Sequence, residues 1–424
     1  MKFDKKVYNN ALWMMSEKII SIFGLLFITS FVAKYVGPNT FGQISLSIAI
    51  FQVVQIIAQM GGDNIIFKRI SKNEISGIIL MRASSLLRGG SFFIISMLVA
   101  IYCYLYVPDD AYIYIFAVGV SYFFLSVDIY SIYNNALLKS KINTISNIIG
   151  LFFGLSIRYV IAYCEMNPYY LSIPIILTTL VPFFIRKFIF GRALKIIDGY
   201  DFVIDSKKIK TYSRYMLLAG TGIVVSSISI ALYSRINQFL LGAVDSVSSV
   251  GIYSVAVTLG TSWGFISQSL ITSFYSRIYS EKNDSVSINL AAKLNRLVFF
   301  ISLLFIAVIF FGGRYILEML YGPSYISAYI PMVLLSIGSL LSSLGTVAYR
   351  FIVKYSGYYF LSKKMSVMLL ISIPLSFFLI KPYGITGAAC STIIIEFISL
   401  TFMNYFFCKG IIFNMHKASF LKWW

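Results

Sequence analysis

The sequence predicts an all-α integral membrane protein with about twelve transmembrane helices, arranged as two six-helix bundles. Three observations lead to this fold class: the composition, the long apolar runs, and the gathering of positive charge in alternate loops. Of the 424 residues, 58% are hydrophobic and only 12% are charged, and the mean hydropathy is +0.83. Because a soluble domain carries about twice that charged fraction, the composition excludes a soluble protein.

A hairpin of two apolar helices opens the chain. Its turn contains a Gly-Pro pair at 37–38, and the apolar run 43–67 that follows carries no charge except Asp63. At about 1.5 Å per residue, such a run is long enough to cross a hydrocarbon core of about 30 Å. The Lys-Arg pair at 68–69 closes the run, as a cationic cytoplasmic flank would.

The other apolar runs are assigned in the same way, and short connections join them on the side of the first turn. The twelve predicted spans are 10–34, 43–67, 88–107, 111–137, 142–164, 170–191, 214–241, 248–275, 297–317, 327–349, 365–381 and 384–408. Helices that are apolar all round show no clear stripe, so length and composition carry this assignment.

The positive charges show which side of the membrane each loop faces. Of the 35 Lys and Arg residues, the assignment leaves all but six in alternate loops or tails on one side. Such asymmetry follows the positive-inside rule and predicts that both termini are cytoplasmic. The net charge of +19 therefore reflects topology, and we expect no nucleic-acid partner. The six exceptions are Lys34, Arg314 and Lys381 on the opposite side, and Lys18, Arg158 and Arg235 inside spans.

A polar stretch at 192–214 divides the chain into two halves of six spans each. We expect an N-terminal bundle over 1–200, a cytoplasmic linker over 201–213 and a C-terminal bundle over 214–424. With an even number of spans, both halves enter the membrane from the same side, so a pseudo-two-fold axis along the membrane normal would relate them. Two such halves can rock around a central cavity that opens to one side at a time.

Five short motifs carry a resemblance to a known family. They are 33–38 (AKYVGP), 41–45 (FGQIS), 250–256 (VGIYSVA), 320–325 (LYGPSY) and 383–389 (YGITGAA). In this order, beside apolar helices, they resemble the Wzx-type O-antigen and polysaccharide flippases of the multidrug/oligosaccharidyl-lipid/polysaccharide (MOP) exporter superfamily. The resemblance runs from about Asn9 to about Asn404.

The resemblance implies a flippase of the bacterial inner membrane. It would move an undecaprenyl-pyrophosphate-linked oligosaccharide, an O-antigen repeat unit of lipopolysaccharide biosynthesis, to the periplasmic leaflet by ion-coupled alternating access. Membrane lipids and other membrane proteins of polysaccharide assembly are the expected partners. A cation-coupled multidrug antiporter shares the superfamily's fold and is the alternative. An O-antigen polymerase is rejected, because the longest outer connection, 312–326, bears a single arginine instead of a large arginine-rich loop.

Cations inside spans are candidates for binding an anionic head group, because charge at membrane depth is expensive and usually faces a cavity or a partner. Arg235 is the first candidate, since the resemblance places spans one and seven against the cavity. Relatives often carry Asp where this chain has Asn237, which puts a shared ion-coupling device there in doubt. Lys18 and Arg158 are further candidates, although solvation near the inner face and snorkelling are the respective alternatives.

Carboxylates inside spans are candidates for ion coupling. Glu396 lies twelve residues past Gly384, near the midplane, and Asp128 and Glu17 are also placed within spans. A structural hydrogen bond to Ser391, Thr392 or a neighbouring helix is the alternative for Glu396.

The sequence offers no catalytic, metal or cofactor site. The four cysteines lie far apart without ligand spacing, His416 is the single histidine, and no nucleotide-binding motif is present. We therefore expect a transporter without a cofactor instead of an enzyme.

Overall fold

The computed structural model describes residues 5–106, 111–196, 211 and 227–420, and helices dominate this part of the chain. Eight of the helices are long and apolar enough to span a membrane, and a bent pair, Val247–Thr261 and Gly264–Tyr275, makes a ninth. Two of the eight each join two predicted spans across a break. The helix at 227–244 is the described part of the seventh predicted span. The described helices thus account for the twelve predicted spans, and the all-α membrane fold is confirmed.

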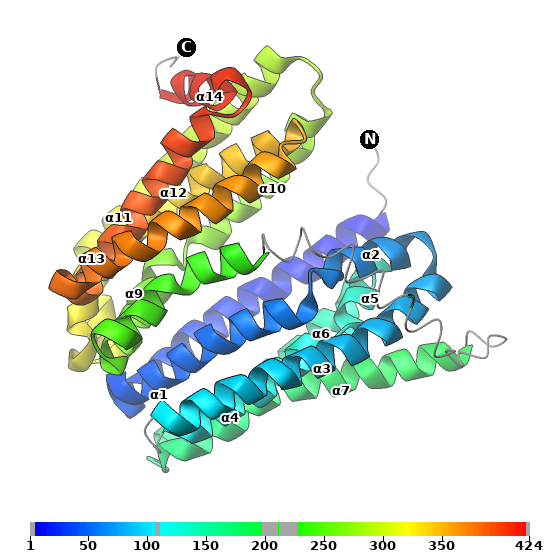
Figure 1. Cartoon of the computed structure of the whole chain (residues 1–424), viewed down its shortest axis with the longest axis vertical. Coiled ribbons are helices and arrows are strands. Elements are labelled where there is room, and N and C mark those ends of the chain that lie inside the picture. Colours follow the sequence, from blue (N-terminus) through cyan, green and yellow to red (C-terminus); the bar gives the residue numbers. More distant parts are fainter. Residues whose placement is uncertain (1–4, 107–110, 197–210, 212–226, 421–424) are drawn as a thin grey trace. The chain divides into compact units, whose positions relative to one another are not determined.

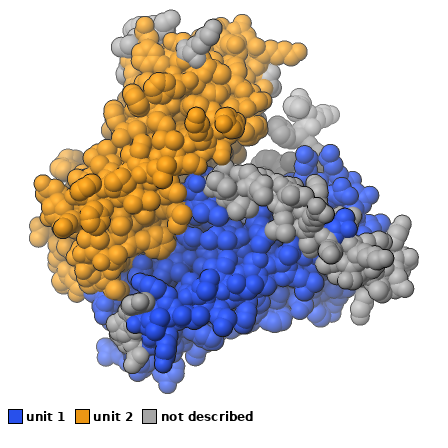
Figure 2. All heavy atoms as spheres, viewed as in Figure 1, with its two compact units in different colours: residues 1–231 blue, residues 232–424 orange. Residues whose placement is uncertain are grey.

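The chain forms two compact units, unit 1 with residues Met1–Ala231 and unit 2 with residues Leu232–Trp424 (Figure 2). The predicted linker at 201–213 lies outside the described residues apart from Thr211. The axis that would relate the two bundles stays a prediction.

Unit 1 contains long helices that follow one another along the chain (Figure 1). In chain order they are α1 (Lys5–Gln59), α2 (Gly62–Lys72), α3 (Glu74–Tyr106), α4 (Tyr112–Val127), α5 (Tyr130–Ala136), α6 (Ser140–Tyr163), the short η2 (Pro168–Leu171) and α7 (Ser172–Ile196).

Helix α1 consists of two arms that meet at Gly37, where φ is 76° and ψ is 173°. Glycine adopts this backbone conformation without steric cost, and proline suits the first position of the helix that follows. The predicted turn at 37–38 is therefore confirmed. The predicted end of the second span at 67 is wrong. Met60 (φ 51°) and Gly61 (φ 63°) are left-handed and end the arm at Gln59, so α2 is a separate helix.

The predicted span 111–137 is also interrupted. Asp128 has φ −78° and ψ 73°, outside the helical region, and it separates α4 from α5. Hydropathy falls after Val127, where Asp128, Asn134 and Asn135 are polar, but such a fall does not show that the backbone leaves the helical region. The interruption matters for the site described below, since it turns the Asp128 side chain toward neighbouring helices.

Unit 2 begins within the helix at 227–244 and continues through further long helices (Figure 1). They are α9 (Val247–Thr261), α10 (Gly264–Ser280), α11 (Asp284–Tyr321), η3 (Pro323–Ala328), α12 (Tyr329–Lys354), α13 (Tyr358–Ile398), the π-helical η4 (Ser399–Met403), η5 (Cys408–Gly410) and α14 (Ile411–Phe420). The axes of α9 and α10 differ by 43°.

Helix α13 is likewise a hairpin, broken at Gly384 with φ 51° and ψ −129°. Its arms run antiparallel, because the Ser376 hydroxyl donates to the Ser391 hydroxyl at 3.1 Å and Gly387 lies against Leu379, nearer the break on both arms. The arms touch at Gly387. A Cβ atom there would lie 2.0 Å from the carbonyl oxygen of Leu379, so only glycine fits this close approach.

Replacing Gly387 with Ala should destabilise unit 2 by about 1–3 kcal/mol, the usual cost of forcing extra volume into a packed position. The effect is measured as a shift of the thermal midpoint of the purified protein in detergent. The midpoint is the temperature at which half of the monodisperse peak in size-exclusion chromatography is lost. Gly345→Ala is the matched control, because no atom lies within 4 Å of a Cβ at Gly345. Equal midpoints for the two variants would contradict the close approach.

Candidate functional site

Unit 2 contains a pocket of about 270 Å³ with several polar side chains in an otherwise apolar wall. Hydroxyl, amide and charged side chains line it, in a region of the chain that is otherwise strongly apolar. The helix at 227–244 and helices α9, α12 and α13 contribute to its wall. The lining residues are Tyr233, Ser234, Arg235, Ile236, Asn237, Gln238, Tyr253, Val257, Thr261, Leu335, Gly338, Ser339, Ser342, Thr392, Ile395 and Glu396.

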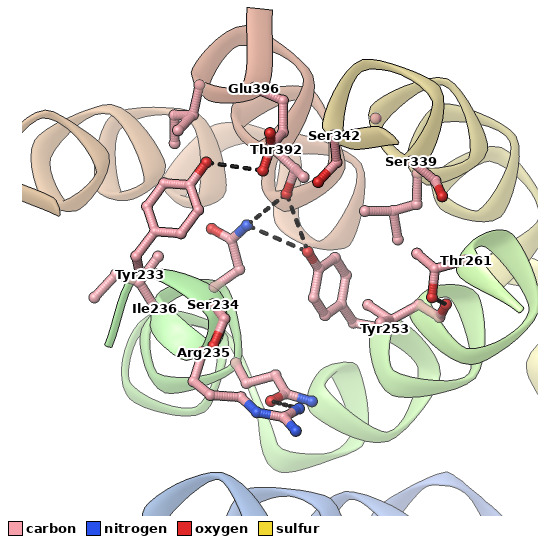
Figure 3. Close-up of a pocket in the computed structure, with 16 residues that line it drawn as sticks. Tyr233, Ser234, Arg235, Ile236, Tyr253, Thr261, Ser339, Ser342, Thr392 and Glu396 are labelled. Atoms are coloured by element: carbon pink, nitrogen blue, oxygen red, sulfur yellow. Dashed lines mark hydrogen bonds between the residues drawn. The ribbon is translucent and has the colours of Figure 1, made fainter. Parts of the chain in front are cut away.

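Two polar contacts join the helix at 227–244 to the second arm of α13. The Tyr233 hydroxyl donates to Glu396 Oε1 at 2.9 Å (Figure 3), and the Asn237 amide donates to Thr392 Oγ1 at 2.9 Å. The contacting residues are four apart on each helix, so each pair lies on one helix face. The two contacts therefore form a polar seam along one side of the pocket.

The buried Asn237 amide is bonded at both ends. Its nitrogen also donates to the Ala388 carbonyl at 3.0 Å and to the Tyr253 hydroxyl at 3.2 Å, and its oxygen accepts from Ser391 at 3.1 Å. A carboxylate could not donate to the Ala388 carbonyl, so the amide fits this position. The departure from the family pattern that the sequence shows at Asn237 thus coincides with a satisfied internal hydrogen-bond network.

Arg235 lies on the same helix, and its side chain points away from the Tyr233–Glu396 contact (Figure 3). One guanidinium nitrogen donates to Gln238 Oε1 at 2.9 Å, and the Gln238 amide donates in turn to the Ser254 hydroxyl at 2.9 Å. Helix α9 therefore holds the half-buried guanidinium at the pocket wall.

Lys364 is a buried cation near Glu396 that does not stand out in the sequence. It is 4% exposed, its ammonium donates to Asn404 Oδ1 at 2.8 Å, and it attracts the Glu396 carboxylate electrostatically. It lies one residue before the predicted span 365–381, so it was counted with the cytoplasmic loop. The structural alternative for Glu396 included a hydrogen bond to a neighbouring helix, and Tyr233 of the helix at 227–244 makes such a bond.

Unit 1 brings two of the predicted carboxylates into one polar network. Glu17 accepts from the Asn147 amide at 2.6 Å, and the Asn147 oxygen accepts from Arg186 at 2.7 Å. Arg186 then forms a buried ion pair with Asp128. The network connects α1, α6 and α7 with the break between α4 and α5, and so links Glu17 to Asp128.

Arg186 does not stand out in the sequence, because it lies beside Lys187 near the inner end of span 170–191, where cations usually flank a helix. In the structure its side chain is buried with Asp128, whereas Lys187 is exposed. Adjacent residues on a helix point in different directions, so one of the two can be buried while the other is exposed, but the sequence does not show which.

The remaining predicted residues join neither cluster. Lys18 is exposed on α1, and Arg158 is half-buried on α6. Asp63, the one charge of the predicted span 43–67, pairs with Arg88 of α3 at 2.7 Å. Among the described residues, no group of three His, Cys, Asp or Glu side chains could hold a metal ion.

The fold is similar to solved transporters and flippases. The lipid II flippase MurJ, inward closed, aligns with a TM-score of 0.67 and 17% identity over 96% of this chain and 90% of that one. An inward-facing multidrug resistance MATE family transporter of the MOP superfamily gives 0.65 and 11%, over 93% and 96%. The MATE transporter VcmN of Vibrio cholerae in its bent form gives 0.58 and 13%, over 98% and 100%.

A comparison with curated protein sequences finds no match. A family model described as "Polysaccharide biosynthesis protein" matches residues 7–272, which is more than half of the chain. This match covers unit 1, the helix at 227–244 and α9, and therefore includes Arg235 and Asn237. The resemblance drawn from the sequence motifs is confirmed: the chain belongs to the polysaccharide biosynthesis protein family and has the fold of the MOP superfamily.

Proposed function

We propose that this membrane transporter is a flippase for an undecaprenyl-pyrophosphate-linked oligosaccharide, an O-antigen repeat unit. It would carry this lipid from the cytoplasmic to the periplasmic leaflet of the bacterial inner membrane by ion-coupled alternating access. The family match and the charge asymmetry of the loops support this proposal, including cytoplasmic termini.

The observation that carries the proposal is the pocket of unit 2, which combines a half-buried arginine with a wall rich in hydroxyl groups. A guanidinium makes paired, charge-assisted hydrogen bonds with phosphate oxygens. Hydroxyl and amide groups exchange hydrogen bonds with sugar hydroxyls. A pocket of about 270 Å³ holds only part of such a head group, so we assign it the portion around the diphosphate. Lys18 and Arg158 are proposed as further contacts for the anion during its passage.

Ion coupling is assigned to the predicted carboxylates, with Glu396 in unit 2 and the Glu17–Asp128 network in unit 1. Protonation of Glu396 would remove the charge that the Tyr233 hydroxyl and Lys364 stabilise. The helix at 227–244 would then be held less firmly against α13. Such a change couples a proton to the movement of a pocket wall without any nucleotide hydrolysis.

The efflux antiporter for amphipathic cations is the second candidate, and Glu396 in the pocket wall is the observation in its favour. An anionic and a cationic substrate make opposite demands on Arg235. Removing that charge should weaken handling of a diphosphate and strengthen handling of a cationic dye.

Replacing Arg235 with Ala should lower surface polysaccharide at least about tenfold in cells that lack the native flippase, because a hydrogen bond to a charged group contributes about 1.5–3 kcal/mol. Arg235→Lys should fall between Ala and the original residue, since it keeps the charge and loses the fork. The control is Arg314→Ala, an exposed arginine of α11. Full restoration by both Arg235 variants at normal expression would refute the head-group assignment, and reduced dye sensitivity on overexpression would favour efflux.

Replacing Glu396 with Gln should abolish the response of transport to an imposed proton gradient while the protein still folds, because glutamine resembles a permanently protonated glutamate. Uptake of a fluorescent lipid-linked saccharide into proteoliposomes at several external pH values measures this response. Glu318→Gln, at an exposed position of α11, should keep it. A gradient response that survives in Glu396→Gln would place the coupling elsewhere.

The Asp128–Arg186 pair should behave as a buried ion pair. Asp128→Asn alone should destabilise unit 1 by about 3–5 kcal/mol, because it leaves Arg186 charged and uncompensated, and the double variant with Arg186→Met should recover most of that loss. Thermal midpoints of the three proteins test this. If the pair also couples ions, the double variant should regain stability but should not transport. Full transport by the double variant would show that the pair has only a structural role.

A further inference from the structure

Helix α2 follows directly after the second arm of α1, at the point where that arm has crossed the membrane. From Pro38 to Gln59 the arm offers about 33 Å of helix, enough for a hydrocarbon core of about 30 Å. The left-handed residues Met60 and Gly61 then redirect the chain into α2. Chain geometry thus places α2 beside the end of a span, at the depth of the lipid head groups.

The two faces of α2 differ in chemistry. Ile66 and Ile70 are buried, while Phe67, Lys68 and Arg69 are exposed, and Phe67 exposes 44% of its surface. A short helix with one packed face and a cationic face that also carries an aromatic ring has the character of an interfacial helix.

The buried face of α2 is part of a cluster that holds four segments together. Ile66 and Ile70 pack with residues of α3, with Tyr133 of α5 and with Phe190 of α7. The exposed cations of these segments and of the start of α6 flank this cluster. We call them the basic platform: Lys68, Arg69, Lys72, Lys139, Lys141, Lys187 and Arg192.

The acidic residues of these segments do not neutralise the platform. Among the described residues from α2 to α7, the acidic residues are Asp63, Glu74, Asp128 and Glu165. Glu165 lies in the link after α6, at the opposite end of that helix from Lys141. Asp63 pairs with Arg88, Asp128 pairs with Arg186, and Glu74 accepts from the Tyr133 hydroxyl at 2.5 Å. The platform cations therefore present a net positive field to their surroundings.

We propose that the basic platform is a binding surface for the head groups of anionic phospholipid, with Phe67 seated at the boundary between head groups and acyl chains. Position, charge and the aromatic ring favour a lipid surface over a soluble polyanion, because an exposed phenyl group gains nothing from an aqueous anion. The platform residues all belong to unit 1 and none of them lines the pocket of unit 2, and the lipid is bound without being transported.

The test uses the purified full-length protein in neutral detergent micelles, titrated with phosphatidylglycerol and with phosphatidylcholine. Phosphatidylglycerol should bind more tightly. Replacing Lys68, Arg69 and Lys72 with Ser should weaken it about a hundredfold, since each basic residue near the surface contributes about a fivefold factor. The charge-preserving exchange Lys68→Arg, Arg69→Lys, Lys72→Arg should retain binding. The matched control removes three exposed cations elsewhere, with Lys34, Arg314 and Lys381 each changed to Ser.

A second measurement needs no variant. Binding of phosphatidylglycerol to the unaltered protein should fall steeply as ionic strength rises from about 0.01 M to about 1 M, because the screening length shrinks from about 30 Å to about 3 Å. Binding of phosphatidylglycerol that does not change with ionic strength would overturn the proposal. An equal loss of phosphatidylglycerol binding in the control triple variant would also overturn it. Displacement of the lipid by inorganic diphosphate at equal phosphate concentration would also overturn it, since the surface would then be a site for soluble anions.

Discussion

The structure depends on one constraint: a polar group at membrane depth has no water to bond and must find its partner within the protein. In unit 1 this constraint produces the chain of contacts from Glu17 through Asn147 and Arg186 to Asp128. In unit 2 it produces the seam formed by Tyr233, Asn237, Thr392 and Glu396. Each polar cluster joins segments that are distant in sequence, so the charges that cost most to bury also define how the helices are held.

The sequence was sufficient to predict the membrane fold and its main turns. Apolar runs of adequate length mark the spans, and the glycines at 37 and 384 mark the two breaks where helices reverse. The break at 60–61 lies inside the predicted span 43–67, where the Gly-Gly pair at 61–62 is its one mark in the sequence. The interruption at Asp128 coincides with a fall in hydropathy after Val127, which by itself does not indicate a break in a helix. Hydropathy describes the side chains of a segment and carries no information on its backbone angles.

The site was predictable only in part. Glu17, Asp128, Arg235 and Glu396 stand out as charges within apolar runs, and the structure places all four in polar clusters. Their partners do not stand out. Asn147 is an ordinary polar residue in sequence, and Arg186 pairs with Asp128 across 58 residues. Such pairing is decided by helix packing, which no local pattern encodes. The same limit applies to Lys364, which a span boundary drawn one residue away assigned to the solvent.

The amide of Asn237 gives the seam of unit 2 an asymmetry along its length. One contact of the helix at 227–244, through Glu396, can lose its charge when a proton arrives, whereas the other, through Asn237, has no charge to gain or lose. Acidification would therefore loosen one attachment and leave the other intact. The helix would then rotate about the contact at Asn237. This rotation would move Arg235, which lies between Tyr233 and Asn237 on the same helix.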